Sequence, residues 1–364
     1  MATTRSSSKR SSKKQQMKRH EGFIWFSTPN IPTKTDPYEL GHGATKNVYL
    51  SEYNSNTGFE ISKIQDDPNK GLDYNKYAIA QIEPKHKGKT FTDDAMDNIH
   101  DELELQIEFA KDGKATKVLG LLLEFPDNTR VVAYTQEDIL HQLTLTPNPR
   151  ICYILMDRCG YTKSGSTMSI WDVSKKPQDV VQQVIRCIDH IVIDKKLIFY
   201  DFKEPNLCVS PENEIIALDF DRYFCKNLTD IKTLPPYSVD DNEPNAAGYM
   251  FLLFTCEYYK SIRNPDPEII SALYEGIKMY QIDSNLEEIC RFSKEGRSTL
   301  EHYLIPKNET RPPSFVQYVR TNYLEPMEKI ATARLTKSTG TKSTGRKSSG
   351  RTKGGKGAKT KKRY

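Results

Sequence analysis

The chain changes character once along its length, between residues 156 and 172. Before this point, short runs rich in β-branched and aromatic residues surround one helical segment, and after it the apolar runs have the length and spacing of helices. The 364 residues suffice for one large or two modest domains with genuine cores. The sequence therefore predicts an α+β fold of two lobes, a small β-rich lobe followed by a larger helical lobe, with a cleft between them.

Strands and helices are expected at definite places in both lobes. In the β-rich lobe, about 21–156, strands are expected at 47–53, 76–82, 118–125, 130–135 and 150–156. A helix is expected at 93–113, where one stripe at helical spacing consists of Ala95, Ile99, Leu103, Gln106 and Ala110. Gly113 is expected to end this helix. In the helical lobe, about 160–330, two short strands are expected at 206–209 and 214–218, and helices at 180–193, 246–262, 267–282 and 285–305.

Four polar residues lie on either side of the two short strands. Asp201, Lys203 and Asn206 are spaced 0, +2 and +5, and Asp219 follows 18 residues after Asp201. One carboxylate can accept the proton of a hydroxyl group, and a carboxylate with an amide oxygen can hold Mg²⁺ against phosphates. The alternative is a surface loop that contains acids by chance, and it would have to produce all four residues in this order around a hairpin.

This order is similar to the catalytic loop and metal motif of protein kinases. The resemblance implies that Asp201 is the catalytic base, that Lys203 is the cation beside the transferred phosphoryl group, and that Asn206 and Asp219 bind the metal. It also implies ATP and Mg²⁺ as cofactors and a protein as the substrate, phosphorylated on serine or threonine. The resemblance covers about residues 36–300 and is strongest at 197–221.

The segment GHGATKNVYL, at 41–50, resembles the glycine-rich loop of the kinases. Gly41 and Gly43 fit the start of the loop and Val48 fits its end, and the resemblance implies that they contact ATP. Lys46 occupies the place of the third glycine. A solvated lysine at the tip of a loop is the alternative interpretation.

A second departure from the kinase pattern lies on the expected strand 76–82, and it compensates for the replacement of the third glycine by Lys46. Ala78 fits the alanine that covers adenine, but Ala80 stands where kinases have their phosphate-binding lysine. Side chains two apart on a strand share a face, so Lys46 is expected to point into the cleft with Val48. This arrangement resembles the WNK ("with no lysine") kinases, in which the lysine comes from the glycine-rich loop. Glu102, on the buried stripe of the expected helix, is then the implied partner of Lys46.

The run ICYILMDRC, at 151–159, resembles the strand that leads into the kinase hinge. The resemblance implies that Met156 is the gatekeeper of the ATP site. It also implies that the segment from Asp157 to Cys159 offers backbone groups to adenine.

Several positions depart from the kinase pattern. Phe199 and Tyr200 replace the usual His-Arg pair, Asp221 replaces the glycine of the metal motif, and no A-P-E motif follows. Three alternatives therefore stay open: a pseudokinase scaffold, a small-molecule kinase of the aminoglycoside-phosphotransferase type, and a nucleic-acid-binding protein with a relic kinase body. The whole pattern resembles the divergent kinases that large DNA viruses encode.

Positive charge is concentrated at the two ends of the chain. The net charge is +5, yet residues 1–20 hold seven lysines and arginines and residues 331–364 hold twelve, with no acid in either segment, so residues 21–330 carry −14. Both ends are expected to be disordered because they have almost nothing apolar to bury. They are expected to bind nucleic acid or another polyanion, to dock on the acidic body, to be phosphorylated, or only to keep the chain in solution.

Cysteines and apolar runs indicate the compartment. The seven cysteines include no C-x-x-C pair, so reduced and mostly buried thiols are expected, not a disulfide framework or a zinc site. The chain has no run of 18 apolar residues, and its first twenty residues do not resemble a secretory signal. We expect the protein in the cytosol or nucleus of a cell, or also in the virion if the protein is viral, with no membrane partner.

Overall fold

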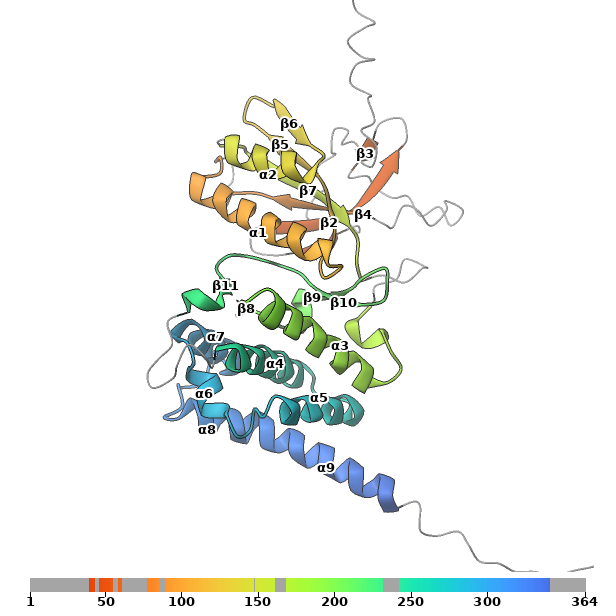
Figure 1. Ribbon diagram of the computed structural model, residues 1–364, viewed down its shortest axis with the longest axis vertical. Coiled ribbons are helices and arrows are strands. Elements are labelled where there is room, and N and C mark those ends of the chain that lie inside the picture. The colour runs from red at the N-terminus through yellow and green to blue at the C-terminus, as the bar shows by residue number, and fades with distance from the viewer. Residues whose placement is uncertain are drawn as a thin grey trace, which may run out of the picture.

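The structure, a computed structural model, describes residues 39–42, 46–54, 58–60, 77–84, 89–146, 148–160, 168–231 and 242–340. Up to residue 157 these residues form an antiparallel sheet with two helices, which we call the sheet region. From residue 168 onward they form the helical region, which lies beside the sheet region (Figure 1). The predicted α+β class and the order of its two parts are confirmed. Among the described helices, none is both long and apolar enough to cross a lipid bilayer.

The sheet has the strand order β1-β2-β4-β7-β5-β6, and β3 pairs with β2. Its strands are β1 Glu39–His42, β2 Lys46–Asn54, β3 Gly58–Glu60, β4 Tyr77–Ile82, β5 Val118–Glu124, β6 Arg130–Ala133 and β7 Ile151–Asp157. All paired strands are antiparallel, and Val48 lies opposite Ala80, which lies opposite Ile154. The five predicted strands are confirmed, and β1 and β3 are additional.

Helices α1, Asp93–Lys111, and α2, Gln136–Leu145, pack on one face of this sheet. Thr92 caps α1, and the predicted stripe is buried from Ile99 onward, with Ala95 only partly covered. Gly113, with a φ of 70°, follows the end of α1 as predicted. The sequence did not predict α2, because only two of its residues, Ile139 and Leu143, are fully buried and the apolar stripe is short.

The helical region is built around one large apolar core. Its α-helices are α3 Pro177–Asp189, α4 Asn242–Ser261, α5 Pro267–Met279, α6 Leu286–Arg291, α7 Lys294–Leu304, α8 Phe315–Val319 and α9 Glu325–Gly340. The π-helical segments are His190–Asp194, which continues α3, and Arg320–Leu324, which joins α8 to α9. Short 3-10 turns lie at Ile170–Asp172, Glu204–Asn206 and Leu228–Asp230.

Two pairs of short strands lie next to α3 and α4, at the side that faces the sheet region (Figure 1). The predicted pair consists of β9 Leu207–Val209 and β10 Ile215–Ala217. A second pair, not predicted, consists of β8 Leu197–Phe199 and β11 Cys225–Asn227. The second pair joins segments that precede and follow the first, so no local hairpin signal reveals it.

Two predicted boundaries are wrong. The expected helix at 285–305 is two helices, because the buried Ser293 starts α7 by accepting a hydrogen bond from the Gly296 backbone N–H. Helix α9 continues through Gly340, ten residues into the segment expected to be disordered. Ala331 is buried there and Arg334 pairs with Glu268 of α5, so this end has packing partners. The rest of the basic end, 341–364, and the basic start, 1–20, lie outside the described residues.

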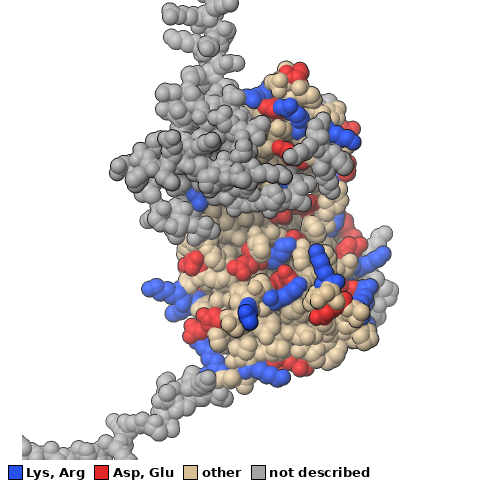
Figure 2. Space-filling view, turned by 180° about the vertical axis from the view of Figure 1, so that it is seen from behind, with Lys and Arg blue, Asp and Glu red and all other residues tan. Residues whose placement is uncertain are grey.

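Charged side chains are interspersed on one face of the helical region. Lysines and arginines alternate there with aspartates and glutamates, separated by uncharged side chains (Figure 2). The negative charge expected of the body is therefore not gathered into a single patch on this face.

Candidate active site

The loop after β8 brings three of the predicted site residues into contact. Asn206 Nδ2 donates to the Asp201 carbonyl oxygen at 2.9 Å and to the Asp201 carboxylate Oδ2 at 3.0 Å. The other carboxylate oxygen, Oδ1, lies 2.8 Å from Lys203 Nζ. Pro205 lies in a 3-10 turn whose last residue is Asn206, and this turn folds the amide back toward Asp201. The spacing 0, +2, +5 thus places a carboxylate, an ammonium and an amide together.

Lys203 is held from two sides. Its Nζ donates to the Tyr303 hydroxyl at 2.9 Å and lies 4.3 Å from the centre of the Tyr303 ring. Burial alone would lower the pKa of the Lys203 ammonium, but its hydrogen bonds to Asp201 and Tyr303 outweigh burial and raise the pKa above its ordinary value. The lysine is therefore charged at neutral pH.

Asp219 follows β10 and faces the loop that carries Asn206. The Leu218 N–H donates to the Asn206 carbonyl at 2.9 Å, so the two loops are joined directly before Asp219. The Asp219 backbone has a φ of 62°, in the left-handed region that aspartate enters more readily than most residues. Such strained positions persist where the surrounding structure fixes them, and they are common at functional sites.

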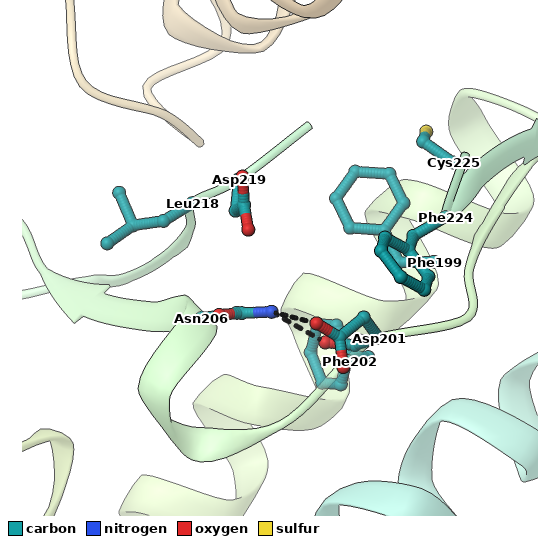
Figure 3. A pocket seen from close by; sticks show the side chains of 8 residues that line it. All are labelled: Phe199, Asp201, Phe202, Asn206, Leu218, Asp219, Phe224 and Cys225. Atoms are coloured by element: carbon teal, nitrogen blue, oxygen red, sulfur yellow. Dashed lines mark hydrogen bonds between the residues drawn. The ribbon is translucent and has the colours of Figure 1, made fainter. Parts of the chain in front are cut away.

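Asp201, Asn206 and Asp219 line one small pocket. Its lining consists of Phe199, Asp201, Phe202, Asn206, Leu218, Asp219, Phe224 and Cys225. The Asn206 amide nitrogen points toward Asp201, and the Asp219 side chain projects toward Asn206 from the opposite wall (Figure 3). The polar groups therefore face one another between largely apolar walls.

Lys46 of the sheet region contacts Asp219, one of the residues that line this pocket. Its ammonium forms an ion pair with Glu102 of α1 and lies 3.7 Å from Asp219 Oδ1. The predicted pairing of Lys46 with Glu102 is thus present in the structure. Lys46 starts β2 and its side chain is 24% exposed, so it is not a solvated residue at a loop tip.

The charge of Lys46 follows from its surroundings. Burial alone would lower the pKa of its ammonium. The carboxylates of Glu102, Asp219 and Asp221 outweigh burial and raise the pKa above its ordinary value. Lys46 is therefore a charged, mostly buried cation at neutral pH, which is the state that phosphate binding requires.

Helix α1 is fixed at both of its faces. Gln106 Nε2 donates to the carbonyl and to the hydroxyl of Thr116, at 3.1 and 2.7 Å, which joins α1 to the segment just before β5. Arg222, three residues after Asp219, forms an ion pair with Asp94 and lies 3.5 Å from Asp101 Oδ2. The position of Glu102 on α1 is thereby linked to the segment that follows Asp219.

An aromatic cluster below the site joins α1 to the helical region. Phe220 is 1% exposed, and its ring centre lies 5.0 Å from that of Phe109 on α1 and 5.3 Å from that of Phe199 on β8. Burial of such a ring is worth about 2–3 kcal/mol. Phe220 therefore anchors the chain immediately after Asp219.

Several of the residues predicted to contact ATP lie on neighbouring strands. Ala78 of β4 lies opposite Met156 of β7, and Gly41 of β1 lies opposite Val48 of β2. The register places Lys46, Val48, Ala78 and Met156 on one face of the sheet, as expected for Lys46 and Val48. Gly43 lies outside the described residues.

The segment after β7 differs from the prediction in its cysteine. Cys159 forms a disulfide with Cys208 of β9, and the Gly160 N–H donates to the Val209 carbonyl at 2.8 Å. The expectation of reduced cysteines is wrong for this pair, because the fold joins segments 49 residues apart and spacing gives no sign of it. The other five cysteines are free and buried, as expected.

One of the backbone groups expected to contact adenine is already engaged. The Asp157 N–H donates to the Lys117 carbonyl at 2.9 Å. Burial raises the pKa of the Asp157 carboxyl group above its ordinary value.

Two contacts of the site were missed from the sequence. Tyr303 lies 100 residues after Lys203, on α7, and Arg222 contacts residues of α1 more than 100 positions before it. No spacing rule links such positions. Asp94 is one of two acids in the first turn of α1, and acids are ordinary at the start of a helix, so nothing in the sequence indicated its contact with Arg222.

Oxygen atoms at the pocket suit a hard divalent cation. Asn206 donates a hydrogen bond from Nδ2 to Asp201, so its amide Oδ1 remains available as an acceptor. The Asp219 carboxylate is 48% exposed. Carboxylate and amide oxygens are ligands that Mg²⁺ accepts readily. A second group of closely spaced potential ligands lies on α1, outside this pocket, and consists of His100, Asp101 and Glu104.

Comparisons with known proteins give no identification, since neither a protein-family model nor a curated protein matches the chain.

Proposed function

We propose that the chain is a protein kinase that uses ATP and Mg²⁺ and phosphorylates serine or threonine hydroxyls. The observation that carries this proposal is the row of charges Glu102, Lys46 and Asp219, which ends at the pocket of Asp201 and Asn206. A cation from β2 thereby takes the place that Ala80 leaves without a lysine. We infer further that the sheet region and the helical region are the two lobes of a kinase fold.

Asp201 is the base of the proposed reaction. Asn206 holds one oxygen of its carboxylate and Lys203 pairs with the other, so the group keeps one orientation. The substrate hydroxyl oxygen attacks the γ-phosphorus, its proton passes to the Asp201 carboxylate, and the bond to the β,γ-bridging oxygen breaks with its electrons leaving on ADP. The atoms and charges of the transfer balance without a further reactant.

The cations of the site carry the electrostatic part of the mechanism. Lys203, next to the base, neutralises negative charge on the transferred group, and Lys46 binds the phosphates of ATP. Asn206 and Asp219 would hold Mg²⁺, which supplies charge neutralisation on the phosphates when bound. Val48, Ala78 and Met156 form the apolar surface for adenine.

Phe199 and Tyr200, which replace the His-Arg pair of kinases, pack in the core. This packing favours an active enzyme over a pseudokinase. Both side chains are buried, and the Tyr200 hydroxyl donates to the Ser293 hydroxyl at 3.0 Å. The Tyr249 hydroxyl donates to the Tyr200 carbonyl at 3.1 Å. The loop that carries Asp201 is thus held by the core and does not require an arginine bound to a phosphate.

The proposal is tested with the purified chain, labelled ATP, Mg²⁺ and a basic protein that contains serine and threonine. We expect phosphoserine or phosphothreonine to form, and Asp201→Asn to lower the rate by roughly 10²–10⁴, the usual contribution of a general base. Asp230→Asn, at an exposed aspartate of a nearby turn, is the matched control and should leave the rate unchanged.

Other outcomes identify the alternatives. ATP binding without transfer in the wild type would indicate a pseudokinase. Transfer to aminoglycosides but not to protein would indicate a small-molecule kinase. Salt-sensitive nucleic-acid binding with neither ATP binding nor transfer would leave the nucleic-acid-binding interpretation.

A further inference from the structure

We propose that Tyr303 is a positioning residue of the active site, which holds the Lys203 ammonium in the orientation that phosphoryl transfer requires. This inference rests on the proposed kinase function. It adds to the site a residue of α7 that lies far from the catalytic loop in sequence and that no motif marks.

Tyr303 contacts Lys203 in two different ways. Its hydroxyl oxygen accepts a hydrogen bond from Lys203 Nζ at 2.9 Å, and its ring centre lies 4.3 Å from the same nitrogen. On its other side the ammonium lies 2.8 Å from Asp201 Oδ1. The ammonium is therefore enclosed between a carboxylate, a hydroxyl and an aromatic face.

The support for Tyr303 is itself rigid. The Tyr303 carbonyl accepts a hydrogen bond from Lys260 of α4, and the next carbonyl, that of Leu304, accepts one from the buried Tyr323 hydroxyl at 2.6 Å. Leu304 is fully buried in the core of the helical region. The end of α7 is thus fixed to α4 and to the segment before α9, and Tyr303 is presented from a rigid element.

A lysine needs such support to act in a defined geometry. Its ammonium has three hydrogens on a flexible four-carbon stem, and ordering this stem costs conformational entropy. Tyr303 accepts one of these hydrogens and Asp201 pairs with the ammonium on its other side, so two partners limit the positions open to the ammonium. Because the partners are in place before a substrate arrives, less of this cost falls on the reaction step.

The protonation of Tyr303 fits the same role. Burial, and then a hydrogen bond toward the Asp201 carboxylate, raise the pKa of the Tyr303 hydroxyl above its ordinary value. The hydroxyl is therefore neutral and accepts from Lys203. A Tyr303 that served packing alone would need only its ring.

The test separates the hydroxyl from the ring. Tyr303→Phe removes the hydroxyl alone, and Tyr303→Leu removes the ring as well. We expect Tyr303→Phe to lower kcat about 10-fold, the usual effect of losing a hydrogen bond to a charged group, with the KM for ATP unchanged. Tyr303→Leu should lower kcat further. Tyr318→Phe is the matched control, since Tyr318 is also partly buried and its hydroxyl contacts the Leu304 carbonyl beside Tyr303.

A second readout does not depend on turnover. Acylation of lysines, followed by peptide mass spectrometry, should label Lys203 several-fold faster in Tyr303→Leu than in the wild type or in Tyr318→Phe, because the ammonium loses both its acceptor and its cover.

The outcomes distinguish this inference from the function on which it rests. A wild-type kcat in Tyr303→Phe, or a raised KM with unchanged kcat, overturns the role of Tyr303 and leaves the kinase function standing. Unchanged labelling of Lys203 in Tyr303→Leu also overturns it. A wild type that transfers no phosphate overturns the proposed function, and the role of Tyr303 with it.

Discussion

The two halves of the candidate site are assembled in different ways. One half, called the base side after the role proposed for Asp201, consists of Asp201, Lys203 and Asn206, which come from one loop of six residues. The phosphate side consists of Lys46, Glu102 and Asp219, which come from β2, from α1 and from the segment after β10. One half is therefore fixed by a local turn, and the other exists only when α1 and the sheet lie correctly against the helical region.

Side-chain burial also differs between the two halves of the site. The paired side chains of Asp201 and Lys203 are 13% and 19% exposed, whereas Asp219 is 48% exposed and its backbone is strained. The phosphate side is thus open at Asp219 and closed at Glu102, which is only 8% exposed. Under the proposed function, a charged ligand would enter from the Asp219 end, and mutations on the phosphate side should act through the placement of Lys46.

Of three changes around Lys46, Asp219→Asn is expected to have the largest effect, because it removes a carboxylate charge from the proposed metal site and from beside Lys46. The rate should fall by at most roughly 10³-fold, which is the range found when one preorganised electrostatic group is lost. Steady-state kinetics at varied Mg²⁺ should show a raised requirement for the metal. A variant with the wild-type Mg²⁺ dependence would show that Asp219 is not a ligand.

A smaller effect is expected for Glu102→Gln, which leaves the Lys46 charge in place but removes the carboxylate that orients it. By analogy with residues that orient metal ligands, turnover should fall about 10- to 100-fold. Glu104→Gln, at an exposed neighbour on the same helix, is the control and should have no effect. Equal losses in the two variants would mean that α1 tolerates neither change and that the pairing of Lys46 with Glu102 has no special role.

The smallest effect is expected for Arg222→Ala, which removes the link between α1 and the segment after Asp219. The Arg222 side chain is 28% exposed and that of Asp94 is 73% exposed, so water screens the pair and it contributes little to stability. Turnover should fall about 5-fold or less, and the loss should shrink at high salt because the pair is screened. A loss that salt does not change would point to packing by Arg222 instead of its charge.

The same difference between local and distant contacts determines which parts of the site the sequence predicts. Asp201, Lys203 and Asn206 lie within one short motif, and their contacts follow from their spacing. Lys46 was placed by strand alternation and Glu102 by the helical stripe, because periodic patterns report which face a side chain occupies. Local patterns thus predicted most of the site and the order of sheet and helices.

Contacts between distant segments left no such sign. Tyr303 meets Lys203 across 100 residues, and Cys159 meets Cys208 across 49. The pairing of β8 with β11 and the short helix α2 were also missed, since three-residue strands and a helix with two buried residues give weak periodicity. These features depend on how whole elements pack, which one chain's local pattern does not specify.

The role proposed for Lys46 is the task of the absent strand lysine, which is to bind the phosphates of ATP. Its most direct test compares Lys46→Met with Lys114→Met in ATP turnover and in thermal unfolding. Lys114 is a matched control, because it also pairs with a glutamate and its side chain is 25% exposed against 24% for Lys46. We predict that Lys46→Met lowers kcat/KM by roughly 10²–10³ while the unfolding midpoint stays close to that of the wild type, and that Lys114→Met changes neither. Turnover that stays near the wild-type value in folded Lys46→Met protein would contradict the account.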